Sequence, residues 1–434
     1  MNASRPSSER DPRGARKDKR YISFMKQSFN VSVDEALAIY GGEPVRRTLL
    51  PYGRQSISES DIAAVAEVLR SDWLTTGPKV AEFEEAFAAF VGARFAISFN
   101  SGTSALHGAA FAAGLGSEDE AITTPMTFCA TSNCVLYQGA RPVFADVSFD
   151  TLNLDPEQAR SKISSHTKAI LPVDYAGHPA DLDAILKIAE QHGLTVIEDA
   201  SHALGGEYGG RRVGQISHMT TFSLHPVKHL TTAEGGMVTT DRADFAETLR
   251  RFRSHGISSD ARARQSAGQW QYEMVLLGMN YRLPDVNCAL GLSQMQGLTE
   301  NLARRRAIAA SYAERLAGVP GLILPTVREG VNPAWHLYPV RVDAGQLTAG
   351  RAEVFRALRA ENMGVNVHYI PVHLHPYYRE RFGYKGGEYP VAEAAYEGLV
   401  SLPMFHAMTD GDVEDVVRAV GKVLKYYAAG FRRT

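Results

Sequence analysis

Short apolar runs alternate with helical patterns along most of the 434-residue chain. Residues 94–99, 168–173 and 194–197 are apolar runs of strand length, each followed by a turn or by acidic residues. Such alternation is typical of a mostly parallel sheet covered by helices, so the sequence predicts an α/β fold. In folds of this kind functional groups sit at the carboxyl ends of the strands, and chemistry is expected there.

The charge balance and the cysteines narrow the class of protein. Lys and Arg total 46 against 48 Asp and Glu, and a formal net charge of -2 offers no field for a nucleic acid or an anionic membrane. The 3 cysteines form no CxxC pattern and cannot all pair within one chain, which predicts a reducing, cytoplasmic location. Neither an export signal nor an apolar segment long enough to span a membrane is found.

The chain is expected to have three parts: a disordered basic tail at 1–40, a large α/β domain at 41–300 and a small α+β domain at 301–434. The helical pattern from Leu298 to Ala317, with several Arg and Glu predicted on its outer face, marks the change of domain. Before the sheet, a second helical face is predicted to pack on the core. That face comprises Ile62, Val65, Ala66, Leu69 and Trp73.

Several familiar catalytic motifs are absent. The chain has no GxxxxGK[ST], no GxGxxG after a strand, no HExxH and no GxSxG, which disfavours kinases, dinucleotide-dependent dehydrogenases, zincins and lipases. His368, His373 and His375 crowd one segment, but their spacing matches no common zinc pattern, and the segment has no Cys or Asp. We therefore predict no metal, and interpret the segment as a substrate-facing loop or plain surface.

Lys228 is the candidate nucleophile. It lies in FSLHPVKHLTTAEGG, between apolar residues and glycines that allow close approach of the backbone. Partial burial lowers the pKa of a lysine, and the neutral amine can attack a carbonyl, so Lys228 is a Schiff-base candidate. The alternative is an ordinary surface lysine.

Asp199 ends a buried strand, where an unpaired carboxylate would be costly. A protonated pyridine nitrogen would be a suitable partner, because pyridoxal phosphate needs that proton to act as an electron sink. The alternative is an Asp that caps the following turn.

A phosphate site is expected where a helix begins after the first strand. Gly102, Thr103 and Ser104 place free backbone N–H groups and hydroxyls at that helix N-terminus, and Ser223 adds another hydroxyl. Phe128 follows another strand and is the candidate to cover a cofactor ring. Each signal alone is weak, since Gly-Thr-Ser is also a common helix cap. Their conjunction with Lys228 and Asp199 predicts a pyridoxal phosphate site.

These segments resemble a known family. SGTSALH, EDASHALGG, FSLHPVKHLTTAEGG and GMNYRL are similar to motifs of the DegT/StrS family of nucleotide-sugar aminotransferases, from about Gly41 to the end of the final helix. The resemblance implies the aspartate aminotransferase fold. LPYGRQSI, LTTGPKVAEFE, SHGI and VHYIPVHLHPYY are most similar to the branch that aminates C4 of a UDP-linked 4-keto-6-deoxy-N-acetylhexosamine for pseudaminic acid biosynthesis.

The resemblance also implies roles for individual residues. Lys228 would form the internal aldimine with pyridoxal 5'-phosphate, Asp199 would pair with the pyridine nitrogen, and Phe128 would stack on the ring. His202 lies where the family has a Gln or His near the ring oxygen. Asn280 would reach the phosphate from a partner subunit, which implies a homodimer with shared active sites. The implied phosphate contacts are Gly102, Thr103, Ser104 and Ser223. The residues expected to face substrate are His229, His255, Tyr369 and His373.

The implied reaction is ping-pong transamination, with L-glutamate as the expected amino donor and a nucleotide-linked keto sugar as acceptor. Alternatives are another nucleotide, such as GDP or dTDP, a dehydratase of the same fold, or a non-catalytic regulator. A dehydratase has His in place of the lysine, and a regulator would have lost Lys228, Asp199 or the phosphate site. Ala233 departs from the family, which has Gly there.

Overall fold

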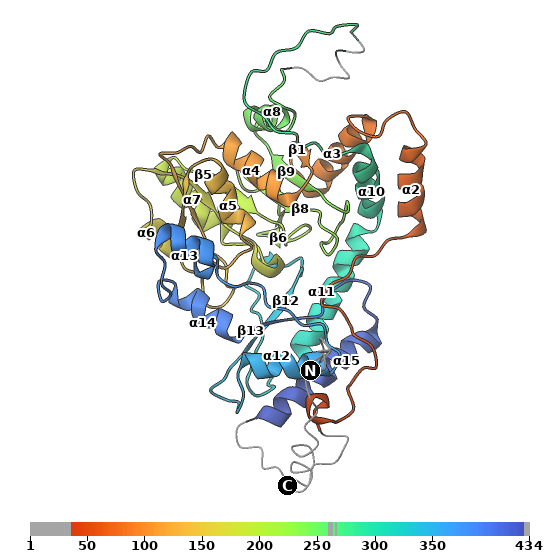
Figure 1. Ribbon diagram of the computed structural model, residues 1–434, viewed down its shortest axis with the longest axis vertical. Helices are drawn as coiled ribbons and strands as arrows, with labels where there is room; N and C mark the ends of the chain where they lie inside the picture. The colour runs from red at the N-terminus through yellow and green to blue at the C-terminus, as the bar shows by residue number, and fades with distance from the viewer. Residues whose placement is uncertain (1–35, 259–263, 265–266, 429–434) are drawn as a thin grey trace, which may run out of the picture.

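A computed structural model describes residues 36–258, 264 and 267–428 (Figure 1). Its centre is a seven-stranded sheet with the order β1-β9-β8-β5-β4-β2-β3. All neighbours from β8 to β3 are parallel, whereas β9 is antiparallel to both β1 and β8. The expected α/β class is therefore confirmed. The strands are β1 (Phe95–Phe99), β2 (Glu120–Thr123), β3 (Arg141–Phe144), β4 (Thr167–Leu171), β5 (Thr195–Asp199), β8 (Met219–Ser223) and β9 (Gly236–Thr240).

Helices cover both faces of this sheet. Apolar side chains of the strands and helices form three buried clusters, which together make the core of the large domain. The helices of this part are α2 (Glu59–Leu69), α3 (Pro78–Val91), α4 (Gly102–Ala112), α5 (Ala130–Tyr137), α6 (Pro156–Ser161), α7 (Leu182–His192), α8 (Ala243–Phe252) and α10 (Asp285–Gln296). Short strands β6 (Glu207–Tyr208), β7 (Arg211–Arg212) and β11 (Val331–Asn332) form a separate sheet.

Helix α11 (Leu298–Arg315) leads from the large domain into the small one (Figure 1). A three-stranded antiparallel sheet of β10 (Leu322–Ile323), β12 (Tyr338–Val342) and β13 (Leu399–Leu402) packs there with α12 (Arg351–Ala360) and α15 (Asp410–Tyr427). One expectation for α11 is wrong. Arg305 does not lie on the outer face, because it is only 1% exposed.

The C-terminal third of the chain divides between the two cores. Helices α13 (Pro376–Phe382) and α14 (Pro390–Gly398) lie beside the large domain (Figure 1), and their apolar residues share a buried cluster with Met126 and Phe144. At the other end, residues 1–35 of the expected tail lie outside the described residues. Leu37 is buried in the small-domain core and precedes a 3-10 helix (Ala38–Tyr40), so ordered chain begins before residue 41.

The apolar face of α2 is not covered within the chain, contrary to expectation. The helix contacts α10, but Ile62 and Leu69 are 53% and 60% exposed. Among the described helices none combines the length and apolarity needed to cross a bilayer. Cys129, Cys134 and Cys288 are free thiols.

Candidate active site

Three strand ends meet at one place because of the antiparallel strand β9. Its first residue, Gly236, pairs with Ser223 at the end of β8 and with Phe99 at the end of β1. A Cβ on Gly236 would lie 2.2 Å from the carbonyl oxygen of Ser101, so only glycine fits here. This close approach brings the N-terminus of α4 beside the end of β8, where the Lys228 loop begins.

Asp199 is buried at the end of β5, and both of its carboxylate oxygens accept hydrogen bonds. Thr131 in α5 donates its hydroxyl to Oδ2 over 2.6 Å, and Ser201 donates its hydroxyl to Oδ1 over 2.6 Å. The backbone N–H of Ser201 also donates to Oδ1. The alternative interpretation as a turn cap is therefore partly right. Each carboxylate oxygen accepts two hydrogen bonds, so Asp199 retains capacity for one further donor at Oδ2.

Lys228 lies half-buried in the loop between β8 and β9. Burial lowers the pKa of its amine to about 8, opposed by the negative charge of Asp199 and assisted by the positive charge of Arg305. The segment before the first helix packs over this loop, since a Cβ on Gly53 would contact Val227 at 3.5 Å. The pKa of Lys228 is thus set by burial together with the opposite effects of a carboxylate and a guanidinium.

The N-terminus of α4 is built as a helix cap with two free donors. Ser101 and Ser104 exchange backbone-to-hydroxyl hydrogen bonds in a capping box, each 3.0 Å long, and the Ser104 side chain is buried. The N–H groups of Gly102 and Thr103 have no acceptor among the described residues. A Cβ on Gly102 would come within 2.9 Å of the Ser223 Cβ. The expected phosphate residues do gather here, but the Ser104 hydroxyl is already committed to the cap.

Phe128, His202 and Tyr369 form the next part of the site. The Tyr369 hydroxyl and Nε2 of His202 are hydrogen-bonded over 2.9 Å. Burial lowers the pKa of His202 well below its usual range, so the ring is neutral. Its Nδ1 is buried and has no hydrogen-bond partner within the described chain. Phe128 is 56% exposed and its ring lies 6.0 Å from Tyr369, which leaves one face open.

Asn280 and His255 lie together on the surface. Both side chains are exposed, and the backbone of His255 bonds to Met279 next to Asn280. The following residue, Tyr281, accepts a hydrogen bond from the backbone of Asn100, just before the cap of α4. The pair therefore borders the edge of the sheet at which α4 begins.

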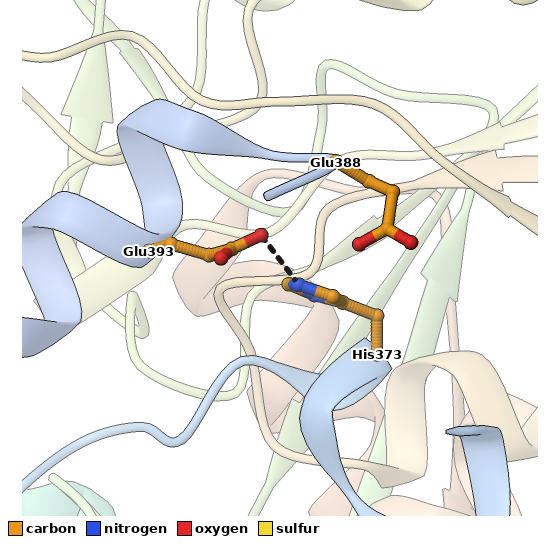
Figure 2. A group of neighbouring side chains, drawn as sticks. All are labelled: His373, Glu388 and Glu393. Carbon is orange, nitrogen blue, oxygen red and sulfur yellow. Dashed lines mark hydrogen bonds and ion pairs between the residues drawn. The ribbon is translucent and has the colours of Figure 1, made fainter. Parts of the chain in front are cut away.

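Two of the residues expected to face substrate, His229 and His373, are buried. His229 is 2% exposed and its Nε2 bonds to the carbonyl of Ala334. His373 is 0% exposed, and its Nε2 is 3.0 Å from Oε1 of Glu393, with Glu388 nearby (Figure 2). Both carboxylates already accept backbone N–H groups of residues 385–389, so they fold that loop. Both side chains are therefore buried and hydrogen-bonded within the described chain.

The backbone conformation of Ala233 explains why glycine is expected at this position. Its φ is +66°, in the left-handed region that strains residues with a Cβ. Its N–H is held by the hydroxyl of Thr231. The loop that carries Lys228 therefore holds an alanine in a backbone conformation that favours glycine.

Sequence reasoning missed Thr131, His336 and Arg305. Thr131 is 68 residues from Asp199, and a lone Thr in a helix gives no signal of that contact. His336 lies with its ring 4.5 Å from that of His202. Arg305 lies in a run of consecutive arginines, and the sequence does not show which of them is buried.

Comparison with known proteins gives consistent matches. The sequence profile of the DegT/DnrJ/EryC1/StrS aminotransferase family matches residues 55–421. Spore coat polysaccharide biosynthesis protein SpsC of Bacillus subtilis is 44% identical over 382 residues, covering 88% of this chain and 98% of that protein. Among solved structures, PseC of Helicobacter pylori, an aminotransferase involved in pseudaminic acid biosynthesis, has a TM-score of 0.81 and 31% identity, covering 88% and 100% of the two chains. The PLP form of the putative sugar aminotransferase Spr1654 of Streptococcus pneumoniae has a TM-score of 0.81 and 29% identity, covering 87% and 99%.

Proposed function

Because this chain belongs to the DegT/DnrJ/EryC1/StrS aminotransferase family, it is a sugar aminotransferase that uses pyridoxal phosphate, and we propose that it aminates C4 of a UDP-linked 4-keto-6-deoxy-N-acetylhexosamine. L-glutamate is the proposed amino donor. The observation that carries the proposal is Lys228, an amine of pKa about 8 within reach of the charge of Asp199. The substrate branch is supported by the likeness to PseC and by the motifs shared with that branch.

The described residues fit the cofactor. His202 has a buried Nδ1 without a hydrogen-bond partner among the described residues, Gly102 and Thr103 have free N–H groups at a helix N-terminus, and Phe128 has an exposed ring. These match a ring hydroxyl, a phosphate and an aromatic ring respectively. When bound, the cofactor supplies an electron sink for the carbon that loses a proton.

Lys228 has the proton-transfer role in this proposal. Its amine would take the proton from the donor carbon and deliver it to the cofactor, and a pKa of about 8 lets one group act as both base and acid near neutral pH. In the second half-reaction the same amine delivers a proton to the sugar carbon. Asp199 keeps a proton on the ring nitrogen of the cofactor, and Thr131 and Ser201 hold its carboxylate in place.

The remaining contacts follow from position. Gly102, Thr103 and Ser223 would hold the phosphate, with Ser104 acting through the cap of α4. Tyr369 orients His202 and lies beside the open face of Phe128, so it is a proposed substrate contact. Exposed His255 remains a proposed substrate contact, and so do His229 and His373, whose side chains are buried and hydrogen-bonded to other residues.

A homodimer with shared active sites is part of the proposal. The apolar face of α2 is uncovered, and further exposed apolar side chains follow at 270–277. Trp270 and Leu277 there are 79% and 75% exposed. Large exposed apolar surface of this kind marks association. In a dimer formed through this surface, the exposed Asn280 of each chain would reach the active site of the other chain.

The test is a panel of keto-sugar nucleotides added to protein that has first been converted to its amine form with L-glutamate. Return of the visible cofactor absorbance scores amination of the added sugar. The UDP-linked 4-keto-6-deoxy-N-acetylhexosamine is expected to restore it fastest, with the GDP- and dTDP-linked sugars as comparison arms. A faster response to one of the latter would replace the proposed substrate, and Lys228→Ala protein is the control for non-enzymatic reaction.

A further inference from the structure

Arg305 is a buried cation whose charge is not neutralised within the described residues. It is 1% exposed, and its Nη1 donates to the carbonyl oxygens of Trp335 and Met404 over 3.1 and 3.2 Å. Its Nε and Nη2 are buried without any partner in the described chain. Burial lowers the pKa of the guanidinium to about 10, so it stays charged at neutral pH. Buried charges are normally paired, and this one needs an explanation.

The two unpartnered nitrogens form one edge of the guanidinium. Nε–H and Nη2–H point the same way and together grip both oxygens of a carboxylate. The chain itself contains an example, because Arg328 donates from Nε and Nη2 to the two carboxylate oxygens of Asp150, each over 2.9 Å. The vacant edge of Arg305 is therefore shaped for a carboxylate that the described chain does not supply.

Three neutral imidazoles lie within electrostatic range of Arg305. Burial lowers the pKa of His336 and His229 well below the usual range and that of His406 to about 4. The positive charge of Arg305 contributes to each of these shifts. The Nδ1 atoms of His336 and His406 are also buried without partners among the described residues. The cluster can thus offer donors to an anion without adding further charge.

Lys228 lies within the electrostatic reach of Arg305, which helps to lower the pKa of its amine. An amino-acid donor carries its α-carboxylate on the same carbon from which Lys228 takes the proton. That carboxylate must consequently lie close to Lys228, and it needs a cation there once water is displaced. Asp199, the other charge that acts on this amine, has the wrong sign.

We propose that Arg305, assisted by His336, binds the α-carboxylate of the amino donor. The inference rests on the proposed function and names the residue that selects an amino acid as donor. Lys228 and His406 are the half-buried members of this cluster, so the donor reaches the guanidinium from their side, with movement of one of these side chains. The other anion that could bind Arg305 is the diphosphate of the sugar nucleotide. The amino donor takes part in the first half-reaction and the sugar nucleotide in the second, so measuring the two half-reactions separately distinguishes the two anions.

The first test uses unmodified holoenzyme and two donors, L-glutamate and L-isoglutamine, in which the α-carboxylate is an amide. Conversion of the resting cofactor absorbance is followed in single turnovers. We expect kcat/KM to be about 100-fold lower with the amide, as for loss of one partner of a buried charge pair. Equal rates with both donors would overturn the inference, whether or not any variant folds.

The second test compares Arg305→Lys with Arg304→Lys, a neighbour whose guanidinium is paired with Asp410 at the surface. Arg305→Lys keeps a positive charge but loses the pair of N–H donors, on Nε and Nη2, that can bind both oxygens of a carboxylate. We expect KM for L-glutamate to rise at least about tenfold, and calorimetric binding of 2-oxoglutarate to the resting holoenzyme to weaken equally. The sugar half-reaction, started from the amine form, should stay within about threefold of wild type. Arg304→Lys should change neither.

A merely structural role would slow both half-reactions of Arg305→Lys alike and leave 2-oxoglutarate binding unchanged, which would overturn the inference. A defect confined to the sugar half-reaction would assign Arg305 to the diphosphate and would overturn it as well. Wild-type protein that accepts no amino-acid donor would overturn the proposed function together with this inference. If wild-type protein transaminates normally but reacts equally with L-glutamate and L-isoglutamine, this inference is wrong and the proposed function stands.

Discussion

The hydroxyl of Thr131 donates to Oδ2 of Asp199 over 2.6 Å, so the start of α5 fixes the carboxylate at the end of β5. Ser201 holds the other oxygen at the same distance. The carboxylate is oriented before any ligand arrives, and its remaining acceptor capacity is directed by two hydroxyls. Such fixed orientation matters for catalysis because the group does not have to reorganise during the reaction.

Asp199→Asn keeps one acceptor oxygen for Ser201, places an amide donor beside Thr131 and removes the charge. We expect the single-turnover rate with the amino donor to fall at least about 100-fold, since the ring nitrogen would no longer be held protonated. Cofactor affinity should change much less. Stopped-flow absorbance gives the rate and equilibrium dialysis the affinity. Unchanged turnover would make Asp199 a turn residue only.

Lys228→Ala should fold and bind the cofactor without a covalent link. Turnover is expected to be undetectable, because no other amine stands at this position. Borohydride treatment followed by mass spectrometry of the peptides should locate the cofactor on Lys228 in wild-type protein and nowhere in the variant. Lys187→Ala on the surface helix α7 is a control that should retain both turnover and labelling. A variant at position 228 that turns over at the wild-type rate contradicts the assignment.

The pKa of about 8 for Lys228 predicts a pH-dependent stability of the cofactor-free protein. The unfolded lysine keeps its proton up to the usual pKa near 10.5, so between pH 8 and 10.5 the unfolded chain binds more protons than the folded one. The free energy of unfolding should therefore gain up to about 3 kcal/mol from this group as pH rises through that window. Below pH 8 this contribution is absent.

Denaturant unfolding of the cofactor-free protein at pH 7.5 and 9.5 measures this effect against Lys228→Met, which lacks the titrating group. Other residues titrate in both proteins, so the difference between the two slopes isolates Lys228. The wild-type protein should gain stability relative to the variant as pH rises. Parallel slopes would mean that the amine has an ordinary pKa.

Asp174 and Glu198 predict a second pH effect, of opposite sign. Oδ2 of Asp174 and Oε1 of Glu198 are buried without another partner among the described residues, and burial raises the pKa of both groups. The folded pair thus keeps a proton that the unfolded carboxyl groups release above about pH 4, so stability falls as pH rises. Asp174→Asn supplies a permanent neutral donor and should stabilise by about 1–2 kcal/mol at pH 8, less at pH 5.

Urea unfolding at the two pH values decides this point. Asp183→Asn, which replaces an exposed carboxylate paired with Arg211, serves as the control and should shift stability little at either pH. If Asp174→Asn destabilises the protein equally at pH 5 and pH 8, the pair does not share a proton.

Subunit mixing tests the shared active site. Lys228→Ala chains and Asn280→Trp chains are each expected to be inactive, because every site in either homodimer lacks one residue. In a mixed dimer one site takes Lys228 from one chain and Asn280 from the other and is intact, so a fully exchanged equal mixture should recover about a quarter of wild-type activity. Asn280→Ser alone tests whether bulk or loss of the amide matters. An exchanged mixture that stays inactive, while exchanged wild-type protein survives, contradicts the shared site.

The sequence alone determined the fold class and the residues with distinctive chemistry. Alternating apolar runs and helical patterns predicted the sheet, and β1, β4 and β5 lie within one or two residues of the expected strands. The motifs around Lys228 and Asp199 were found because a lysine enclosed by apolar residues and a carboxylate at a strand end are unusual locally. Each of these signals lies within a few neighbouring residues, so it can be recognised without knowledge of the fold.

Only the tertiary structure decided which side chains meet across long separations. The apolar face of α2 is exposed and Arg305 is buried. Helical periodicity in the sequence predicts neither result, because it identifies a face of a helix and not what covers that face. His229 and His373 are found in the sequence beside motifs, but only the structure shows that both side chains are buried. Burial and partner choice depend on elements tens to hundreds of residues apart, and these are fixed only when the chain has folded.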